Sequence, residues 1–374
     1  MMIFQHIDEY HPFDGIGNDC RGLRKIFQKL SLSDFIVTQR NFCPEEENVL
    51  LVKNLIQKAN KFIEINQNSI HILHYGGSGY PLDFFLNLPG RKFLRFHNVT
   101  PSEFYQGCNE SVFISMDKFF TKSVLELSSL SNEIELAICD SNTNAEFIKQ
   151  HSSIPTITIP IVKDYTDLTN FNSKSISLER KSSNEKEDLV FVGRIVPNKK
   201  IQDIIVLFFF WKKINPTAKL HLIGGLVPGI EEYFNFINSL IIEFDLVDSI
   251  KIYFKIDDTQ KSKILQDSLY YISMSEHEGF GIPLLEAMQN HLVVVAYAST
   301  AIPETMKRGG ILFYEKNFPV MVEILNKIKN DTSLYDSVLA TQEKALQYYK
   351  NYPFLEKIQN IFLNHKSEIK KFYE

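Results

Sequence analysis

Hydrophobic residues in this chain fall into short apolar runs, separated by longer stretches in which apolar positions recur at helical spacing. Runs such as Ile70–Tyr75 and Leu189–Val192 are each followed directly by glycine, and their length is typical of buried strands. Within residues 21–30, apolar positions follow the i, i+3, i+4, i+7 pattern of a half-buried helix. Alternation of this kind predicts parallel β-sheets covered by helices.

Two series of such elements follow one another. The first series has predicted strands at 3–7, 35–37, 70–75, 93–97, 134–139 and 156–159, and predicted helices at 21–30 and 48–63. The second has predicted strands at 189–192, 219–223, 250–254, 269–274 and 292–296, and predicted helices at 201–213 and 231–244. The pattern predicts an α/β protein of two Rossmann-like, doubly wound parallel sheets, in which ligands bind at the carboxyl ends of the strands.

A polar stretch separates the two series. Residues 180–188 are almost all charged or small and polar, so they cannot build a core. We therefore expect an N-terminal domain at 1–165 and a linker at 166–188. A second domain is expected at 189–350, and a last amphipathic helix at 351–374.

Composition narrows the functional classes. A chain of 374 residues with a formal net charge of −5 accommodates two domains and gives no general electrostatic case for binding nucleic acid. The four cysteines form no Cys-x-x-Cys pair, which argues against structural zinc and suits a reducing compartment. The N-terminus lacks the pattern of a signal peptide, and the longest apolar run, 204–211, is far shorter than a membrane span. We expect a cytoplasmic protein.

The densest cluster of chemically distinctive residues is 275–288, which follows a predicted strand. Gly279 and Gly281 allow close backbone approach to a ligand, and Pro283 suits the first turn of a helix. The free N–H groups at such a helix start favour a phosphate. Glu278 and Glu286 would repel that phosphate, so we expect them to accept hydrogen bonds from sugar and ribose hydroxyls. A strand-turn-helix corner with solvated glutamates is the structural alternative.

This cluster resembles the motif of retaining glycosyltransferases of the GT-B fold, family 4, in which two glutamates are separated by seven residues. The resemblance implies two domains facing across a cleft, an acceptor-side domain at 1–165 and a nucleotide-sugar-binding domain at 189–350. It also implies that the last helix, 351–374, packs back on the N-terminal domain. The same resemblance implies that Glu278 contacts the donor sugar and Glu286 the nucleotide ribose. The segment between them is then expected to bind the diphosphate, through the amides of Gly279, Phe280, Gly281, Ile282 and Leu284, with Pro283, which has no N–H, as a further contact residue.

A basic loop follows the first predicted strand of the second series. Gly193 and Arg194 are followed five residues later by Lys199, and in the same family these residues clamp the donor diphosphate. A solvated basic loop is the plainer interpretation. The chain contains no Asp-x-Asp, the usual carboxylate signature of a metal-bound sugar nucleotide in the other major glycosyltransferase fold. We therefore predict no metal site, no metal dependence and no cofactor, since the nucleotide sugar is a substrate.

The first half carries weaker signals. Gly15 and Gly17 lie in a predicted loop that faces the donor diphosphate and acceptor in the resembling family, although a plain loop is equally compatible with the sequence. His97 ends a predicted strand, and its family counterpart approaches the donor sugar; a packed histidine is the alternative. We expect the segment beginning at Asp140 to cap a helix, through Ser141 or Asp140 itself. His71 and His74 should point to opposite faces of their strand and hold no metal.

Two segments depart from the family pattern. Many relatives have a glycine where Phe254 falls, in a region near the nucleobase that extends to Ile256, so the identity of the base stays open. Residues 298–304 keep the Pro-Glu of the family but lack its paired glycines.

The sequence predicts a metal-independent, retaining hexosyltransferase (EC 2.4) that uses a UDP- or GDP-sugar, in bacterial-type surface polysaccharide or glycoconjugate synthesis. The acceptor hydroxyl could belong to a carbohydrate, a lipid-linked molecule or a protein. Basic and aromatic residues at 91–96 and 118–122 leave peripheral membrane contact open. The alternatives are a catalytically weak, glycosyltransferase-like scaffold subunit and a GT-B sugar-nucleotide epimerase.

Overall fold

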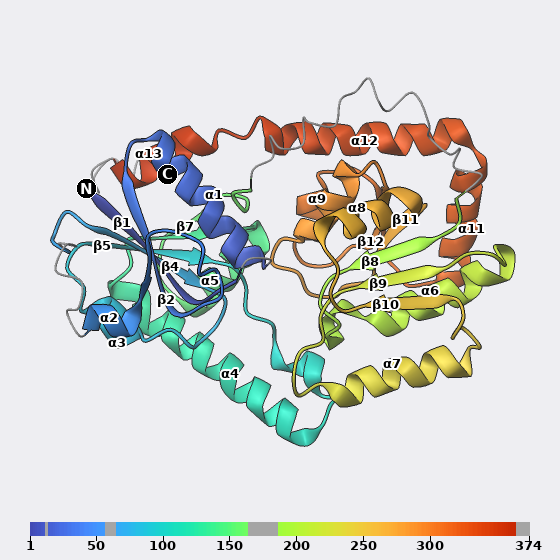
Figure 1. The fold of residues 1–374 in the computed structure, drawn as a ribbon, viewed down its shortest axis with the longest axis horizontal. Helices are drawn as coiled ribbons and strands as arrows, with labels where there is room; N and C mark the ends of the chain where they lie inside the picture. The colour runs from blue at the N-terminus through green and yellow to red at the C-terminus, as the bar shows by residue number, and fades with distance from the viewer. Residues whose placement is uncertain (12–13, 57–64, 164–185, 364–374) are drawn as a thin grey trace. The chain divides into compact units, whose positions relative to one another are not determined.

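The computed structural model describes residues 1–11, 14–56, 65–163 and 186–363, which divide between two units (Figure 1). The first unit takes in residues 1–99, 118–164 and 352–374, and the second takes in 100–117 and 165–351. Most of the predicted linker, 166–188, lies outside the described residues.

The first unit is built on a fully parallel sheet with the strand order β3-β2-β1-β4-β5-β6-β7. Because the order reverses between β1 and β4, the loops after these two strands diverge to opposite faces and leave space at the sheet edge. The strands are β1 Met2–Tyr10, β2 Ser33–Asn41, β3 Val49–Leu51, β4 Ile70–Tyr75, β5 Arg91–Phe96, β6 Leu136–Cys139 and β7 Thr156–Thr158.

Helices cover both faces of this sheet. One core contains side chains of α4 and α5, whereas the other contains side chains of α1 and α13. On α13, the Phe362 ring lies 4.9 Å from the Phe93 ring of β5 and 5.8 Å from the Phe27 ring of α1. The helices are α1 Gly15–Lys29, α2 Val52–Ile56, α3 Leu82–Leu86, α4 Glu110–Ser129, α5 Asn142–His151 and α13 Phe354–Leu363, with a 3₁₀ turn, η2, at Leu130–Asn132.

The second unit is built on a second parallel sheet, with the order β10-β9-β8-β11-β12-β13. Its order reverses between β8 and β11, which places the switch point at the loops that follow these strands. The strands are β8 Leu189–Val192, β9 Leu220–Ile223, β10 Ile250–Tyr253, β11 Tyr270–Ser273, β12 Val293–Tyr297 and β13 Ile311–Phe313.

The main core of the second unit packs α6, α7 and α11 against the sheet, around the fully buried Trp211. Helices α9 and α10 follow β11 and β12, and α12 packs against α9. The helices are α6 Ile201–Ile214, α7 Glu231–Glu243, α8 Asp258–Asp267, α9 Ile282–Gln289, α10 Ile302–Met306, α11 Phe318–Asn330 and α12 Thr332–Lys350, with 3₁₀ turns at η1 Ser102–Tyr105 and η5 Pro197–Lys199.

Two segments differ from the sequence expectations. The helix predicted at 48–63 is instead the short strand β3 followed by α2, and residues 57–64 of that prediction lie outside the described residues. Residues 100–117, expected in the N-terminal domain, group with the second unit because Tyr105 is buried in the second core and Phe104 and Met116 pack against it.

The α/β class and the two parallel, doubly wound sheets are confirmed. The domain limits and the cleft between the domains stay predictions. Within the described part of the chain, each helix is too short or too polar to cross a bilayer.

Candidate functional site

The switch point of the second sheet brings two predicted motifs together. The loop after β8 contains 193–200, and the loop after β11 contains 274–281. Asn198 joins them: its buried side-chain amide donates to the His277 carbonyl at 3.0 Å, and its own carbonyl accepts from the Glu276 amide at 2.9 Å. The two loops are therefore fixed to each other by hydrogen bonds that do not depend on a ligand.

Helix α9 begins at the end of the second loop. Its N-cap, Gly281, has φ 96° and ψ 54°, a left-handed conformation that glycine adopts without strain, and no side chain of the described residues caps this helix start. Pro283 lies in the first turn, as the sequence predicts. Thr305 Oγ1 of α10 donates to the Phe280 carbonyl at 2.5 Å and so fixes the loop backbone just before the helix. The helix start can therefore offer its N–H groups to an anion.

Several predicted contact residues can meet a ligand only through their main chain. Phe280 is buried, with its ring 5.8 Å from the Tyr349 ring of α12, and Leu284 is buried as well. This arrangement suits the predicted role of the amides in this segment. Ile282 and Pro283 are partly exposed.

Lys199 and Glu278 face each other across the two loops. Lys199 Nζ lies 2.5 Å from Glu278 Oε1, and about one-sixth of each side chain is exposed: 15% for Lys199 and 16% for Glu278. Thr300 Oγ1 accepts from the Glu278 amide at 2.8 Å, which fixes the backbone beneath this pair. The predicted phosphate cation and the predicted sugar carboxylate thus form an ion pair with each other.

The sequence interpretation missed a second group of charges beside this pair. Glu276 binds Lys200 Nζ at 3.0 Å and Lys316 Nζ at 2.5 Å, and Lys316 also binds Asp203 at 2.6 Å. Although partial burial would raise the pKa of Glu276, the hydrogen bonds from Lys316 and Lys200 lower it below its usual value. Lys316 follows β13, so only the fold could bring it to this loop.

Glu286 is paired as well. Lys261 Nζ of α8 lies 3.5 Å from Glu286 Oε2 and 3.0 Å from Asp258. Burial alone would lower the pKa of Lys261, but these two carboxylates raise it above its usual value. Helix α8 begins just after Ile256, which is the predicted nucleobase contact. Lys261 therefore links the helix next to Ile256 with Glu286, which is the predicted ribose contact.

Gly224, at the end of β9, is a position that the motif analysis did not identify. A Cβ atom there would lie 1.8 Å from the Gly193 carbonyl oxygen, so only glycine permits this backbone approach. The Gly193 amide donates to the Ile223 carbonyl at 2.9 Å, and the Gly224 amide donates to the Tyr253 carbonyl at 2.9 Å. The Gly224-Gly225 pair directly after a predicted strand was the available signal.

Arg194 is exposed directly after Gly193, and its side chain forms no ion pair or hydrogen bond with the described residues. Burial raises the pKa of the nearby Tyr105 hydroxyl, and the Arg194 charge opposes that shift. Arg194 and Lys199 therefore supply two cations from one loop, the arrangement that binds a diphosphate.

In the first unit, the loop predicted around Gly15 and Gly17 is helical. Helix α1 begins at Gly15 and not near Arg21, because Asp14 caps it by accepting from the Gly17 amide at 2.5 Å. A Cβ on Gly17 would lie 2.3 Å from the His11 carbonyl oxygen. These glycines thus lie in the first turn of a helix that follows β1, where N–H groups remain near the switch point.

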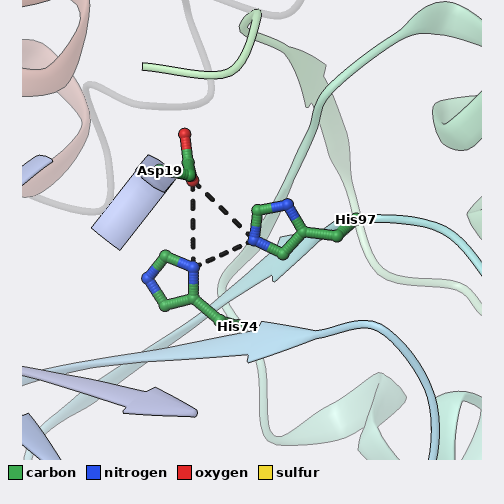
Figure 2. A group of neighbouring side chains, drawn as sticks. All are labelled: Asp19, His74 and His97. Atoms are coloured by element: carbon green, nitrogen blue, oxygen red, sulfur yellow. Dashed lines mark hydrogen bonds and ion pairs between the residues drawn. The ribbon is translucent and has the colours of Figure 1, made fainter. Parts of the chain in front are cut away.

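The side chain of His97 is 4% exposed and lies among buried polar residues, with Asp19 and His74 beside it (Figure 2). Its Nδ1 is 2.9 Å from Asp140 Oδ2, and its Nε2 is 2.9 Å from His74 Nδ1. Both ring nitrogens are therefore occupied within the first unit, so the predicted hydrogen bond to a sugar hydroxyl requires the ring to leave a partner.

Arg95 neutralises the carboxylates of this network. Its Nε lies 2.7 Å from Asp19 Oδ2, its Nη2 lies 3.0 Å from Asp19 Oδ1, and Asp140 Oδ1 is 2.9 Å from Nη2. Burial would raise the pKa of Asp19, but the guanidinium lowers it below its usual value. Ser141 caps α5 by accepting from the Asn144 amide, as predicted, whereas Asp140 instead binds His97.

The prediction that His71 and His74 point to opposite faces is confirmed, because His71 contacts His6 whereas His74 contacts His97. Ligand atoms of Asp19, His74 and His97 lie close enough together to surround a metal ion. However, Arg95 already binds both oxygens of Asp19, so its charge opposes a divalent cation at this position.

Comparison with known proteins relates the second unit to a described family. Residues 173–345 match the sequence model of the family described as glycosyl transferases group 1, a range that includes both site loops and Glu286. The chain therefore carries a glycosyl transferases group 1 domain over these residues.

One curated relative is the poly(ribitol-phosphate) alpha-N-acetylglucosaminyltransferase of Staphylococcus aureus (strain COL). It is 27% identical over 176 residues, which is 46% of this chain. The match spans about a third of the length of that relative, 34%.

Solved structures share the fold, which confirms the GT-B assignment. Sucrose-phosphate synthase from Thermosynechococcus elongatus superposes with a TM-score of 0.71 at 14% identity, covering 100% of this chain and 98% of its own. Anabaena HepE in complex with UDP and glucose gives 0.66 at 14% identity, covering 93% and 95%. A S. aureus TarM mutant in complex with UDP and sugar ligands gives 0.61 at 19% identity, covering 83% and 58%.

Proposed function

We propose that this protein is a retaining glycosyltransferase that moves a hexose-type sugar from a UDP-sugar to an acceptor hydroxyl. The observation that carries the proposal is the charge arrangement at the second switch point: Lys199, Glu278 and the open start of α9 lie together inside the glycosyl transferases group 1 domain. UDP is favoured over GDP because the solved structures of HepE and TarM contain UDP.

The proposed donor contacts divide between phosphate and sugar. Arg194, Lys199 and the amides near Gly281 bind the diphosphate, and they stabilise the negative charge that develops as it leaves. Glu278 accepts hydrogen bonds from the sugar hydroxyls, and Glu286 accepts from the ribose. When the donor binds, Lys199 exchanges its bond to Glu278 for phosphate oxygens, which frees the carboxylate for the sugar.

The acceptor belongs to a surface polysaccharide or glycoconjugate in this proposal. Support comes from the S. aureus relative that glycosylates poly(ribitol phosphate) and from the fold shared with WaaG, a glycosyltransferase of lipopolysaccharide biosynthesis. With two cations placed for the diphosphate and no Asp-x-Asp in the sequence, we propose that transfer needs no divalent metal. A chelator should then leave the rate unchanged.

The test measures the thermal shift with UDP, GDP and their sugars, followed by hydrolysis and transfer assays on the stabilising donor. Glu278→Gln should lower transfer by about 100-fold or more while the affinity for UDP stays within a few-fold, because the carboxylate contacts sugar and not phosphate. Glu243→Gln is the control, since it removes an exposed carboxylate at the end of α7 in the same unit, outside both site loops.

Other outcomes would replace the proposal. UDP binding with neither hydrolysis nor transfer would favour the scaffold subunit, and conversion of one UDP-sugar into another would favour the epimerase. Loss of UDP affinity together with transfer in Glu278→Gln would contradict the division between sugar and phosphate contacts.

A further inference from the structure

The first unit contains two chains of hydrogen-bonded histidines, on opposite faces of β4. In the first chain, the Tyr80 hydroxyl lies 2.8 Å from His6 Nδ1, and His6 Nε2 lies 3.0 Å from His71 Nδ1. His71 Nε2 then lies 3.1 Å from the Pro89 carbonyl oxygen. The Tyr80 hydroxyl and the two neutral imidazoles each bring one proton, and the chain has three hydrogen bonds. Every bond can therefore be formed without a charged ring.

The second chain has a different proton count. His74 Nε2 lies 3.0 Å from Gln5 Oε1, His74 Nδ1 lies 2.9 Å from His97 Nε2, and His97 Nδ1 lies 2.9 Å from Asp140 Oδ2. Both ends of this chain can only accept. The Gln5 amide cannot be reversed, because its nitrogen donates to the Cys20 carbonyl at 3.2 Å. Two neutral imidazoles bring two protons, and the chain needs one more.

The surrounding charges decide where the additional proton lies. The Arg95 guanidinium lies 2.9 Å from Asp140 Oδ1, so a negative charge at this end of the chain is paired with a cation. Burial lowers the pKa of His74 well below its usual value, with the charge of His97 adding to the effect. His97 bonds the Asp140 carboxylate directly, and its Nε2 lies 3.7 Å from Asp19 Oδ2. A proton on His97 also balances the buried network, with two cations against two carboxylates.

We propose that His97 is held as an imidazolium, protonated on both ring nitrogens, and that His74 is the positioning residue that holds it so by presenting an unprotonated Nδ1. The charged groups around the ring come from each neighbouring element. Helix α1 contributes Asp19, with Asp14 at its cap, β5 contributes Arg95, and the end of β6 contributes Asp140.

This inference extends the proposed function and rests on it for its catalytic meaning. An imidazolium at the end of β5 cannot act as a general base toward an acceptor hydroxyl. It can instead provide a fixed positive charge to a substrate in which negative charge develops. Transfer should therefore need the protonated pair, and the rate should fall at alkaline pH as the pair loses its proton.

The direct test is nitrogen NMR of the whole protein labelled with ¹⁵N-histidine, with the His97 signals assigned by their absence in His97→Gln. At neutral pH, both His97 nitrogens should resonate as protonated, and one His74 nitrogen as unprotonated. A His97 ring with one unprotonated nitrogen at neutral pH would overturn the proposal. So would a stoichiometric metal ion, found by elemental analysis, whose removal changes these signals, because the metal would then occupy the position of the proton.

Variants test the role of His74. His74→Leu removes the acceptor, so the alkaline fall in kcat should move to lower pH by about one unit or more, with little change in the KM for the donor. His74→Asn offers an oxygen near the position of Nδ1 and should restore much of the profile. His71→Leu, on the opposite face of the same strand, is the matched control for lost packing and should leave the profile in place. An unchanged profile in folded His74→Leu would contradict the positioning role.

The two proposals fail separately. The NMR result needs no turnover, so it stands if no sugar is transferred. A neutral His97 in an active enzyme would refute only the charge inference.

Discussion

The close contact between the ends of β8 and β9 allows a test of whether it positions Arg194 in the site. Replacing Gly224 with alanine adds a Cβ atom 1.8 Å from the Gly193 carbonyl oxygen, whereas real Cβ contacts do not fall below 3.0 Å. Hydrogen bonds of 2.9 Å from the Gly193 and Gly224 amides hold both segments in place. The two backbones must therefore separate by more than about 1 Å, which strains these bonds.

We expect two effects of Gly224→Ala. Overpacking should lower the free energy of unfolding by about 1–3 kcal/mol. Because Arg194 follows Gly193 directly, the displacement should also weaken UDP binding, and a misplacement of ~1 Å can cost up to about 100-fold in rate. Urea unfolding measures the first effect and calorimetry with UDP the second.

The neighbouring glycine supplies the control. A Cβ on Gly225 meets no atom of the described part of the chain within 4 Å, so Gly225→Ala should unfold close to wild type and keep its affinity for UDP. If Gly224→Ala matched Gly225→Ala in both assays, the close approach of the two strand ends would not be what positions Arg194.

Two further predictions concern the buried charges and histidines of the first unit. Asp19→Asn leaves the Arg95 guanidinium without its bidentate partner and should cost about 3–5 kcal/mol of unfolding free energy. In contrast, Glu135→Gln at a partly exposed arginine pair on the same strand should cost about 1 kcal/mol or less; equal losses in urea titrations would contradict the burial argument. Burial lowers the pKa of His6 well below its usual value and that of His71 to about 4. As the pH falls, these two histidines are therefore protonated in the unfolded chain before they are protonated in the folded chain. Stability should therefore fall as the pH drops from about 7 toward 4, with a slope of up to ~1.4 kcal/mol per pH unit for each histidine, and a melting temperature that is constant over this range would refute the assignment.

Local patterns of hydrophobic and polar residues predicted most of the fold. The strands at 70–75 and 189–192 have the predicted limits, since a run of apolar residues that ends at glycine depends little on distant contacts. The start of α1 could not be predicted in the same way. Two glycines oppose a helix locally, and the Asp14 cap, together with packing of α1 on the sheet, outweighs that preference.

In the candidate site too, the sequence predicted what depends on local pattern and did not predict contacts between distant segments. The positions of Glu278 and Arg194 at the carboxyl end of the second sheet could be predicted, because each residue lies in a loop that follows a buried strand. The partners of Glu276 and Asp140 could not be read, since Lys316 and Arg95 approach from distant segments. The clash at Gly224 depends on the spacing of two strands, which no local pattern encodes.

Helix α6 begins at Lys200, a cation in a left-handed conformation where the helix dipole favours an anion, and no side chain among the residues that the structure describes caps this start. Glu276, from the other loop, supplies that negative charge, and its amide bonds the Asn198 carbonyl just before the helix. Each loop therefore completes the other, and neither can open alone without exposing an uncapped helix or a broken ion pair. In amide exchange the two segments should behave as one cooperative unit, so that protection at 198–201 and at 276 is lost together.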